Sequence, residues 1–438
     1  MITSEYASVA RSSGDALIGE VLAGLAVILA VAFVFARLAK LIRQPVVMGE
    51  IIAGVALGPS LLGLLPGDPV NTLFPADARP ILQALSQLGL VMFMFGIGYE
   101  LDFARLRGHG RRVTSVSLGS MALPLALGTG LAVLLFPWYD ESQLGTDGVL
   151  APALFLGAAM SITAFPVLSR IIAEYGMQRS RVGSMALACA AVQDFLAWCV
   201  LAVVVAVATA SGAWPLARLV LESALFLVVL LCVVRPGLRR LLAPERSRAV
   251  GGSLIHAVLV TGLLVSAWAT NQIGLHAVFG AFAFGAAVPR DRLQARAPQV
   301  VERIEQTSLF LLPVFFTVTG LSVDIGGLAG HGLIMTAAAV LVACTGKFVG
   351  AAASAGLTGA TRAEAMTLGV LLNARGLTEL VILNVGLGLG MLDSRMFSAM
   401  VVMALVTTFM TGPLLQRLGF HEGRRPAPVA KEKADHGV

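Results

Sequence analysis

Apolar stretches long enough to cross a lipid bilayer follow one another along almost the whole chain, and they constrain its fold more than any other feature. A transmembrane helix needs roughly 20 mostly apolar residues, and about 13 segments qualify. They lie at approximately 17–36, 45–63, 80–101, 113–137, 151–174, 182–209, 216–241, 253–273, 275–289, 306–324, 332–357, 364–391 and 395–416. Charged residues make up 13% of the chain, about half the share typical of soluble domains. The sequence therefore predicts an all-α polytopic membrane protein.

Arginine and lysine are concentrated in every second connection between these segments. Of the 31 basic residues, 25 lie in the odd-numbered connections and the C-terminal tail, and four lie on the opposite side. Cytoplasmic loops carry such an excess, so we expect an external N-terminus and a cytoplasmic C-terminus in the inner (plasma) membrane. The same distribution accounts for the net charge of +6 without a nucleic-acid partner. We expect the charged tail, residues 421–438, to be disordered.

Two sequence motifs occur twice, which indicates an internal repeat. The segment 93–102 resembles 315–324, with Phe, Gly and Asp at matching positions, and 49–54 resembles 280–285 in its two glycines. The members of each pair lie seven spans apart, in the third and tenth and in the second and ninth spans. Because seven is odd, one half is inverted in the membrane relative to the other. Inverted repeats of this kind are typical of secondary transporters. The transmembrane domain, residues 1–420, would then comprise halves at about 17–209 and 253–416 and a linker helix at about 216–241.

The repeat pairs the segments at 151–174 and 364–391, and both contain residues that interrupt helices. In the first, Pro166 removes a backbone donor, and Ser161 and Thr163 can bond to the groups that it frees. The second has polar or flexible residues at its centre, namely Asn373, Arg375, Gly376 and Glu379. Interrupted helices at corresponding positions indicate the binding site of a transporter. We therefore expect two crossed, discontinuous helices at these segments.

Arg375 and Glu379 stand four residues apart and so share a helix face. Half-helices that meet in mid-membrane expose positive N-terminal and negative C-terminal dipole ends. The two side chains can offset these dipoles or form an ion pair with each other. In both cases we expect them to support the crossed helices, together with Asn373 and Pro166, without touching the ion.

A single carboxylate, Asp194, lies in the otherwise apolar run 184–207. A charge near the middle of such a span costs several kcal/mol unless it is protonated, paired, hydrated or bound to a cation. The neutral Gln193 precedes it, so the ionisable unit is one carboxylate beside one amide. This chemistry suits a site that holds either a proton or a small cation. The structural alternative is a protonated acid that bonds to a neighbouring helix.

Four stretches, in order along the chain, resemble the monovalent cation:proton antiporter-2 family. They are 44–60 (QPVVMGEIIAGVALGPS), 161–170 (SITAFPVLSR), the pair Gln193–Asp194, and 373–380 (NARGLTEL). The Gln–Asp pair resembles the Kef-type potassium/proton branch, and the second stretch also resembles the plant cation/proton exchangers. The resemblance implies a homodimer in which each protomer has a dimerisation domain and a mobile core that carries the ion like an elevator. Kef-type systems often have a cytoplasmic nucleotide-binding domain, and here that regulation would need a separate cytoplasmic subunit.

The resemblance also implies roles for individual residues. Asp194 would carry a proton and a cation alternately. Gln193 beside it, and Ser161 and Thr163 at the first interruption, would complete the site that binds the ion or proton. Lys347 falls where electrogenic sodium/proton relatives place a lysine paired with the first acid of an Asp-Asp motif. Because that acid is Gln193 here, Lys347 can pair with Asp194, extend to the membrane surface, or be neutral.

We therefore expect antiport of a monovalent cation, potassium before sodium, against protons. If only Asp194 titrates, exchange is one for one and electroneutral, which we favour; a second proton released by Lys347 would make it electrogenic. The sequence leaves open a cation channel, a proton- or sodium-coupled symporter of an organic solute, and a transporter-like sensor. It contains no catalytic triad, phosphate-binding loop or metal-site spacing. We expect no enzyme, and no cofactor or metal other than the transported ions.

Overall fold

The computed structural model describes residues 2–42, 44, 46–100, 110–144, 148–177, 180–209, 213–243 and 251–420, and within these ranges it contains helices and no strand. The predicted all-α fold is therefore confirmed. The charged tail at 421–438 lies outside the described residues, so its disorder stays a prediction.

Helices occupy every predicted membrane segment. Ten are long and apolar enough to cross a bilayer, some together with the short turns that extend them. These ten are α1 (Ile2–Leu41), α2 (Val46–Leu57), α4 (Arg79–Glu100), α6 (Gly110–Leu135), α9 (Arg181–Thr209), α10 (Ala213–Val229), α12 (Gly252–Ile273), α15 (Pro298–Leu321), α16 (His331–Leu357) and α19 (Ser394–Arg417). The remaining three segments contain the shorter helices α7 (Leu150–Ser161), α8 (Phe165–Glu174), α13 (Ala277–Ala287), α17 (Arg362–Leu372) and α18 (Leu377–Gly388). Short elements between them are η1 (Leu62–Leu64), α3 (Pro69–Leu73), η2 (Phe136–Trp138), η3 (Glu141–Gln143), the π-helical turn η4 (Leu230–Val234), α11 (Arg235–Leu241), α14 (Arg290–Arg296) and η6 (Gly326–Leu328).

The first helix is longer than the apolar segment predicted at 17–36, because α1 begins at Ile2. No proline occurs before the apolar segment, so the chain contains no obligatory stop for a helix there. Hydropathy alone does not detect a polar extension of this kind.

Both predicted interruptions are present. Residues 162–164 separate α7 from α8, and residues 373–376 separate α17 from α18. Pro166 is the second residue of α8, a position where its missing N–H would have no partner within the helix. Each interruption therefore frees backbone groups in the middle of a membrane segment.

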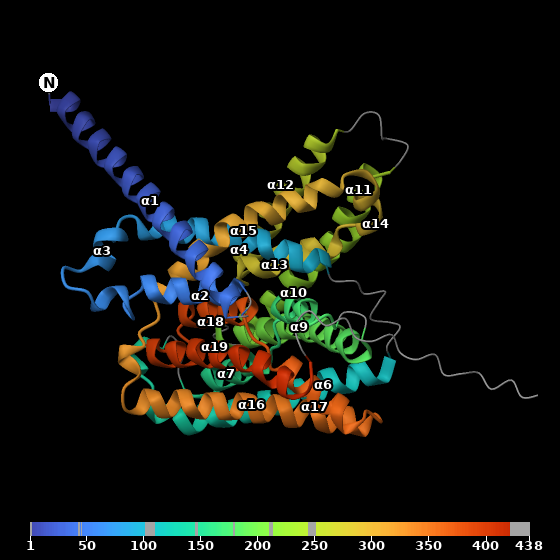
Figure 1. The fold of residues 1–438 in the computed structure, drawn as a ribbon. Coiled ribbons are helices and arrows are strands. Elements are labelled where there is room, and N and C mark those ends of the chain that lie inside the picture. The colour runs from blue at the N-terminus through green and yellow to red at the C-terminus, as the bar shows by residue number, and fades with distance from the viewer. Residues whose placement is uncertain are drawn as a thin grey trace, which may run out of the picture.

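The helices form two bodies. One is a layer that we call the panel, in which α1, α2, α4, α12, α13 and α15 pack on one another. The other, which we call the bundle, consists of α6–α9 and α16–α19 around the two interrupted helices. Figure 1 shows α4, α13 and α15 on one side of the molecule and α6, α16 and α17 on the opposite side. Helices pack far more extensively within each body than between them, an arrangement that suits movement of one body against the other.

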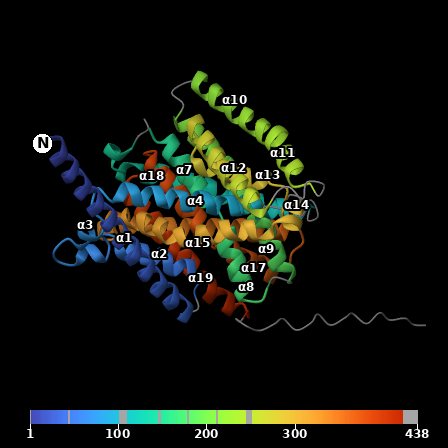
Figure 2. The same cartoon turned by 90° about the horizontal axis from the view of Figure 1, so that it is seen from above.

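The linker predicted at about 216–241 consists of α10, η4 and α11. Most of its large apolar residues are exposed, with Trp214 at 79% and Leu221 at 70%, and Figure 2 shows it at the edge of the molecule. Exposed apolar surface of this extent faces lipid or another subunit. The exact bounds of the two halves on either side of the linker stay a prediction.

The predicted repeat is visible in the packing of its glycines. α2 approaches α15 at Gly54, where a methyl group would lie 2.1 Å from the Phe316 carbonyl oxygen. α13 approaches α4 at Gly285, where a methyl group would lie 2.2 Å from the Phe95 carbonyl oxygen. All four residues belong to the repeated motifs. Equivalent helices of the two halves also have equivalent neighbours. α1 packs on α2 as α12 packs on α13, and α6 packs on α7 as α16 packs on α17. The inverted repeat is therefore confirmed.

We expect Gly98→Ala to destabilise the protein, because its methyl group would lie 2.1 Å from the Phe282 carbonyl oxygen and force α4 away from α13. Overpacking of this kind costs about 1–3 kcal/mol. Gly96→Ala is the control, since it lies two residues earlier in α4 and its methyl group meets nothing within 4 Å. Thermal unfolding in detergent should show a lower transition for Gly98→Ala alone. Equal transitions in the two variants would contradict the close approach.

Candidate ion-binding site

The two interruptions lie against each other and are joined by hydrogen bonds. The Ala164 N–H donates to the Ala374 carbonyl oxygen at 3.2 Å, and the Thr163 hydroxyl lies 2.7 Å from the Leu372 carbonyl oxygen. These bonds use backbone groups that the interruptions free from their own helices, which satisfies them without water. The two broken helices therefore cross in direct contact.

Arg375 holds the end of α7 at this crossing. Its guanidinium donates to the carbonyl oxygens of Ala159 (3.3 Å) and Met160 (2.6 Å), in the last turn of α7, and to the Glu379 carboxylate (2.8 Å). The side chains of Arg375 and Glu379 are 0% and 1% exposed. A cation at a helix C-terminus offsets the negative dipole end, and Glu379, in the first turn of α18, offsets the positive one. The ion pair considered from the sequence is present, and it contacts the helix framework.

Neighbouring helices hold the second interruption in place. Thr408 of α19 accepts a hydrogen bond from the Arg375 N–H at 2.9 Å, and its hydroxyl donates to the Arg375 carbonyl oxygen at 2.8 Å. Asn373 ends α17, and its side-chain amide lies 3.7 Å from the Cys344 Sγ of α16. The Asn373 Oδ1 has no hydrogen-bond partner within the described ranges.

Asp194 lies on α9 beside the first interruption and is 1% exposed. Its Oδ2 accepts a hydrogen bond at 3.2 Å from the N–H of Phe165, the first residue of α8. The N-terminus of a helix offers free N–H groups and a positive dipole end, and both favour a negative group. The Asp194 Oδ1 has no hydrogen-bond partner among the residues that the structure describes. One carboxylate oxygen is thus fixed by a hydrogen bond, and the other is available to bind a proton or a cation.

Gln193 connects three helices next to this carboxylate. Its Nε2 donates to the Ser120 Oγ of α6 at 2.7 Å. Its Oε1 lies 2.7 Å from the Thr163 hydroxyl and 3.1 Å from the Lys347 ammonium. The Thr163 hydroxyl has one hydrogen, so it can donate either to Gln193 or to the Leu372 carbonyl oxygen. The amide therefore ties the first interruption to α6, α9 and α16.

Lys347 projects from α16 into the crossing and is 0% exposed. Its Nζ lies 2.5 Å from the Ser161 carbonyl oxygen, 2.8 Å from the Thr163 Oγ1 and 3.1 Å from the Gln193 Oε1. These three acceptors match the three hydrogens of an ammonium group. Lys347 therefore does not extend to the membrane surface. It is bonded to neutral oxygens and forms no ion pair with Asp194, although both residues are described.

The structure places Ser161 at the crossing and adds two residues that the sequence did not indicate. Ser161 contributes its carbonyl oxygen to Lys347, while its hydroxyl donates within α7. Ser120 and Thr408 contact the site through their hydroxyls. A signal for Ser120 exists in the sequence, because Thr114, Ser117 and Ser120 recur every third residue and so lie on one face of α6.

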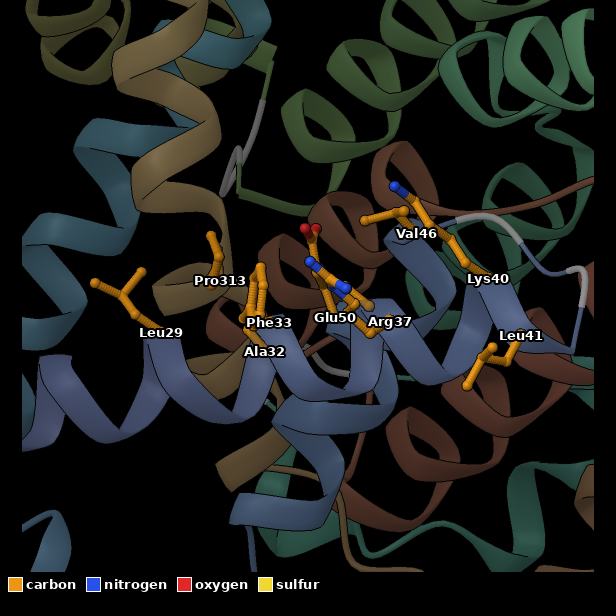
Figure 3. A pocket seen from close by; sticks show the side chains of 10 residues that line it. Leu29, Ala32, Phe33, Arg37, Lys40, Leu41, Val46, Glu50 and Pro313 are labelled. Atoms are coloured by element: carbon orange, nitrogen blue, oxygen red, sulfur yellow. The ribbon is translucent and has the colours of Figure 1, made fainter.

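These residues do not line a large groove in the panel. That groove, of about 740 Å³, runs between α1, α2 and α15 (Figure 3). Apolar residues line it together with Arg37, Lys40 and Glu50, which Figure 3 labels. The crossing is enclosed by comparison, since Asp194 and Lys347 are both within 1% of full burial. The candidate ion site is therefore closed to solvent in this conformation.

Comparison with known proteins places the chain in a family. The family model described as the transmembrane sodium/hydrogen exchanger matches residues 26–421. The Na⁺/H⁺ antiporter NhaS4 of Synechocystis is 37% identical over 91% of this chain and 97% of that protein. Cation/H⁺ antiporter 20 of Arabidopsis thaliana is 37% identical over 90% of this chain and 48% of that protein. The K⁺/H⁺ antiporter 1 of Saccharomyces cerevisiae is 34% identical over 86% and 44%, so the chain spans about half the length of these last two relatives.

A solved structure shares the fold. The sodium proton antiporter MjNhaP1 of Methanocaldococcus jannaschii, at pH 8, matches with a TM-score of 0.56 and 14% identity. The match covers 92% of this chain and 97% of that chain. The helices, the interruptions and the family model all agree with the resemblance seen in the sequence. The chain therefore belongs to the sodium/hydrogen exchanger family of multi-pass membrane proteins.

Proposed function

We propose that the chain exchanges a monovalent cation for protons, with Asp194 as the group that binds each in turn. The observation that carries this proposal is the state of the carboxylate, whose Oδ2 is held by the Phe165 N–H while its Oδ1, also buried, has no partner in the described structure. A buried oxygen without a partner is costly, and a proton or a cation would remove that cost. Family membership and the antiporter names of the relatives support the same activity.

Competition for one oxygen couples the two ions. A protonated carboxyl and a cation-bound carboxylate both leave the site without the uncompensated negative charge of the empty carboxylate. An uncompensated charge is expensive inside a membrane protein, so the bundle would move past the panel readily when loaded and poorly when empty. Obligatory exchange follows from this difference, and the limited packing between bundle and panel would allow the movement.

Lys347 supports one-for-one, electroneutral exchange. The acceptors of its ammonium group are a carbonyl, a hydroxyl and an amide oxygen, and none of them changes charge when Asp194 loses its proton. Lys347 can therefore keep its proton while a cation replaces the proton on Asp194. One positive charge would then move in each direction per cycle.

We propose potassium as the preferred cation, with sodium as the alternative. The preference rests on the Gln193–Asp194 pair, which resembles the Kef-type branch, while the printed names of relatives include both a Na⁺/H⁺ and a K⁺/H⁺ antiporter. We also propose a homodimer in the inner (plasma) membrane, with the N-terminus outside and the C-terminus in the cytoplasm.

The test is proton efflux from acid-loaded proteoliposomes that contain the purified chain. We expect external potassium to collapse the pH gradient, sodium to act more weakly, and choline to have no effect. Electroneutral exchange predicts that the initial rate stays the same when the membrane potential is clamped at different values. A rate that follows the potential would instead favour release of a second proton by Lys347.

Other outcomes would favour the remaining functions. Cation flux without opposing proton movement, driven by voltage alone, would indicate a channel. Proton entry that needs an organic solute would indicate a symporter. A folded protein that moves neither ion would contradict antiport and favour a transporter-like sensor.

A further inference from the structure

A small polar chamber lies between the panel and the bundle, away from the crossing of the broken helices. Its volume is about 70 Å³, which is room for several water molecules. Its polar lining consists of Gln83, Ser86, Gln87, His276, Thr319 and Asn384. The first five belong to α4, α15 and the residue that caps α13, all in the panel, and Asn384 belongs to α18 of the bundle.

Among the residues that the structure describes, the lining contains amide, hydroxyl and imidazole groups, and no Asp, Glu, Lys or Arg. Neutral oxygens can replace water around a monovalent cation, but they bind it weakly enough to let it leave. A fixed positive charge would repel the cation, and a fixed carboxylate would retain it. The composition therefore suits passage of a partly hydrated monovalent cation.

The residues that line the chamber show which of its ends faces the middle of the membrane. On each of three helices an apolar lining residue, Leu90 of α4, Phe315 of α15 or Val381 of α18, lies nearer the middle of the membrane than the polar ones. Asn384 stands eight residues beyond Gly376 at the second interruption, which is about 12 Å along a helix. The polar end thus faces away from the crossing, at the end of the molecule where α4 and α13 begin. By the arginine distribution this end is external.

A hydrogen bond joins the two bodies across the chamber. The Asn384 Nδ2 donates to the Thr319 Oγ1 at 2.9 Å and also lies 2.9 Å from the Leu380 carbonyl oxygen of its own helix. Movement of the bundle along the panel would have to break the bond to Thr319, whereas the bond to Leu380 would travel with α18. The bond to Thr319 is therefore specific to the arrangement of the two bodies in this structure.

We propose that this chamber is the external end of the transport path and that the Asn384–Thr319 hydrogen bond is a latch that keeps it closed. This inference rests on the proposed antiport, since it assigns the route by which cation and protons reach Asp194 from outside. Thr319 and Asn384 then set the balance between closed and outward-open states, and neither of them needs to bind the ion at the crossing.

The latch is tested with a thiol reporter inside the chamber. Gln87→Cys is introduced after the four native cysteines have been replaced, and spheroplasts are treated with a membrane-impermeant trimethylammonium methanethiosulfonate. Thr319→Val removes the hydroxyl at nearly constant volume. Losing one hydrogen bond shifts a two-state equilibrium by roughly two- to tenfold, so we expect the labelling rate to rise by about that factor.

Two further variants sharpen the test. Thr336→Val is the matched control, because the Thr336 hydroxyl bonds to the Gly332 carbonyl oxygen within α16, and it should leave the labelling rate unchanged. Asn384→Leu should act like Thr319→Val, and the double variant should add nothing, because both changes remove the same bond.

The results separate the latch from the antiport. Equal labelling in Thr319→Val and Thr336→Val, or labelling only in inverted vesicles, would overturn the latch even if cation-driven proton efflux persists. A latch-dependent labelling rate in a protein that exchanges no cation for protons would support the latch as a conformational contact and refute the transport path. Latch-dependent labelling together with exchange would support both.

Discussion

Asp194→Asn is expected to abolish cation-driven proton movement, so that the pH gradient of loaded proteoliposomes lasts as long as in protein-free ones. A carboxamide has nearly the shape of the carboxyl group and can still accept the hydrogen bond from the Phe165 N–H. It does not titrate, however, and it offers a cation no negative charge. The variant therefore removes the proposed chemistry and keeps the geometry of the site. Proton efflux on addition of potassium or sodium measures the effect.

A matched control exists elsewhere in the chain. Asp324 also accepts a backbone hydrogen bond through one carboxylate oxygen, from the Gly327 N–H at 2.9 Å, but it is exposed and lies outside the bundle. Asp324→Asn should exchange cations for protons like the wild type. Exchange by Asp194→Asn at the wild-type rate would refute the assignment of Asp194.

Stability measurements distinguish loss of chemistry from loss of fold. Asp194 is an isolated buried carboxylate whose Oδ1 has no partner among the described residues, so a neutral amide in its place should not lower stability. We expect thermal unfolding of Asp194→Asn at or above the wild-type temperature. If the inactive variant unfolds at a lower temperature than the wild type, misfolding would explain its loss of activity, which contradicts the expectation.

Hydropathy and helix breakers were sufficient to predict the frame of this site. The membrane segments, the interruptions near Pro166 and Gly376, and the isolated Asp194 depend on local composition, which the sequence states directly. The inverted repeat was also predictable, because close helix contacts at Gly54 and Gly285 tolerate no side chain and so leave a glycine pattern. These features need no knowledge of which helices meet.

The hydrogen-bond partners within the site were not predictable, because they depend on which helices meet and at what height. A serine or threonine in a helix usually bonds to its own backbone, as Ser161 does within α7. Ser120 also donates to the Val116 carbonyl oxygen of its own helix, but it accepts a further hydrogen bond from Gln193. Thr408 bonds to the backbone of Arg375 in another segment. The sequence does not show which hydroxyls make such additional contacts. The same holds for Lys347, whose acceptors come from residues 154 to 186 positions away.

Arg375→Met is expected to destabilise the protein strongly. The change leaves the Glu379 carboxylate and the carbonyl oxygens of Ala159 and Met160 without the guanidinium that bonds to them, at a site where both charged side chains are at most 1% exposed. Removing one partner of a buried ion pair costs about 3–5 kcal/mol. Thermal unfolding in detergent should show a transition well below that of the wild type, and exchange should be lost with it.

The chain provides a control of identical spacing for this prediction. Arg218 and Glu222 also stand four residues apart, at 2.7 Å, but the Arg218 side chain is 70% exposed. Exposed pairs are worth roughly 0–1 kcal/mol, so Arg218→Met should unfold close to the wild type. Equal transitions for Arg218→Met and Arg375→Met would contradict a supporting role for the buried pair.

A double variant identifies the origin of the cost. In Arg375→Met/Glu379→Met the buried carboxylate is gone as well, and pairs replaced together by apolar residues are often tolerated. We expect the double variant to recover much of the stability lost in Arg375→Met. The carbonyl oxygens at the end of α7 would still lack a cation, so exchange should stay impaired because the first interruption is no longer held in place beside Asp194. Recovery of exchange together with stability would show that Arg375 acts only by neutralising Glu379.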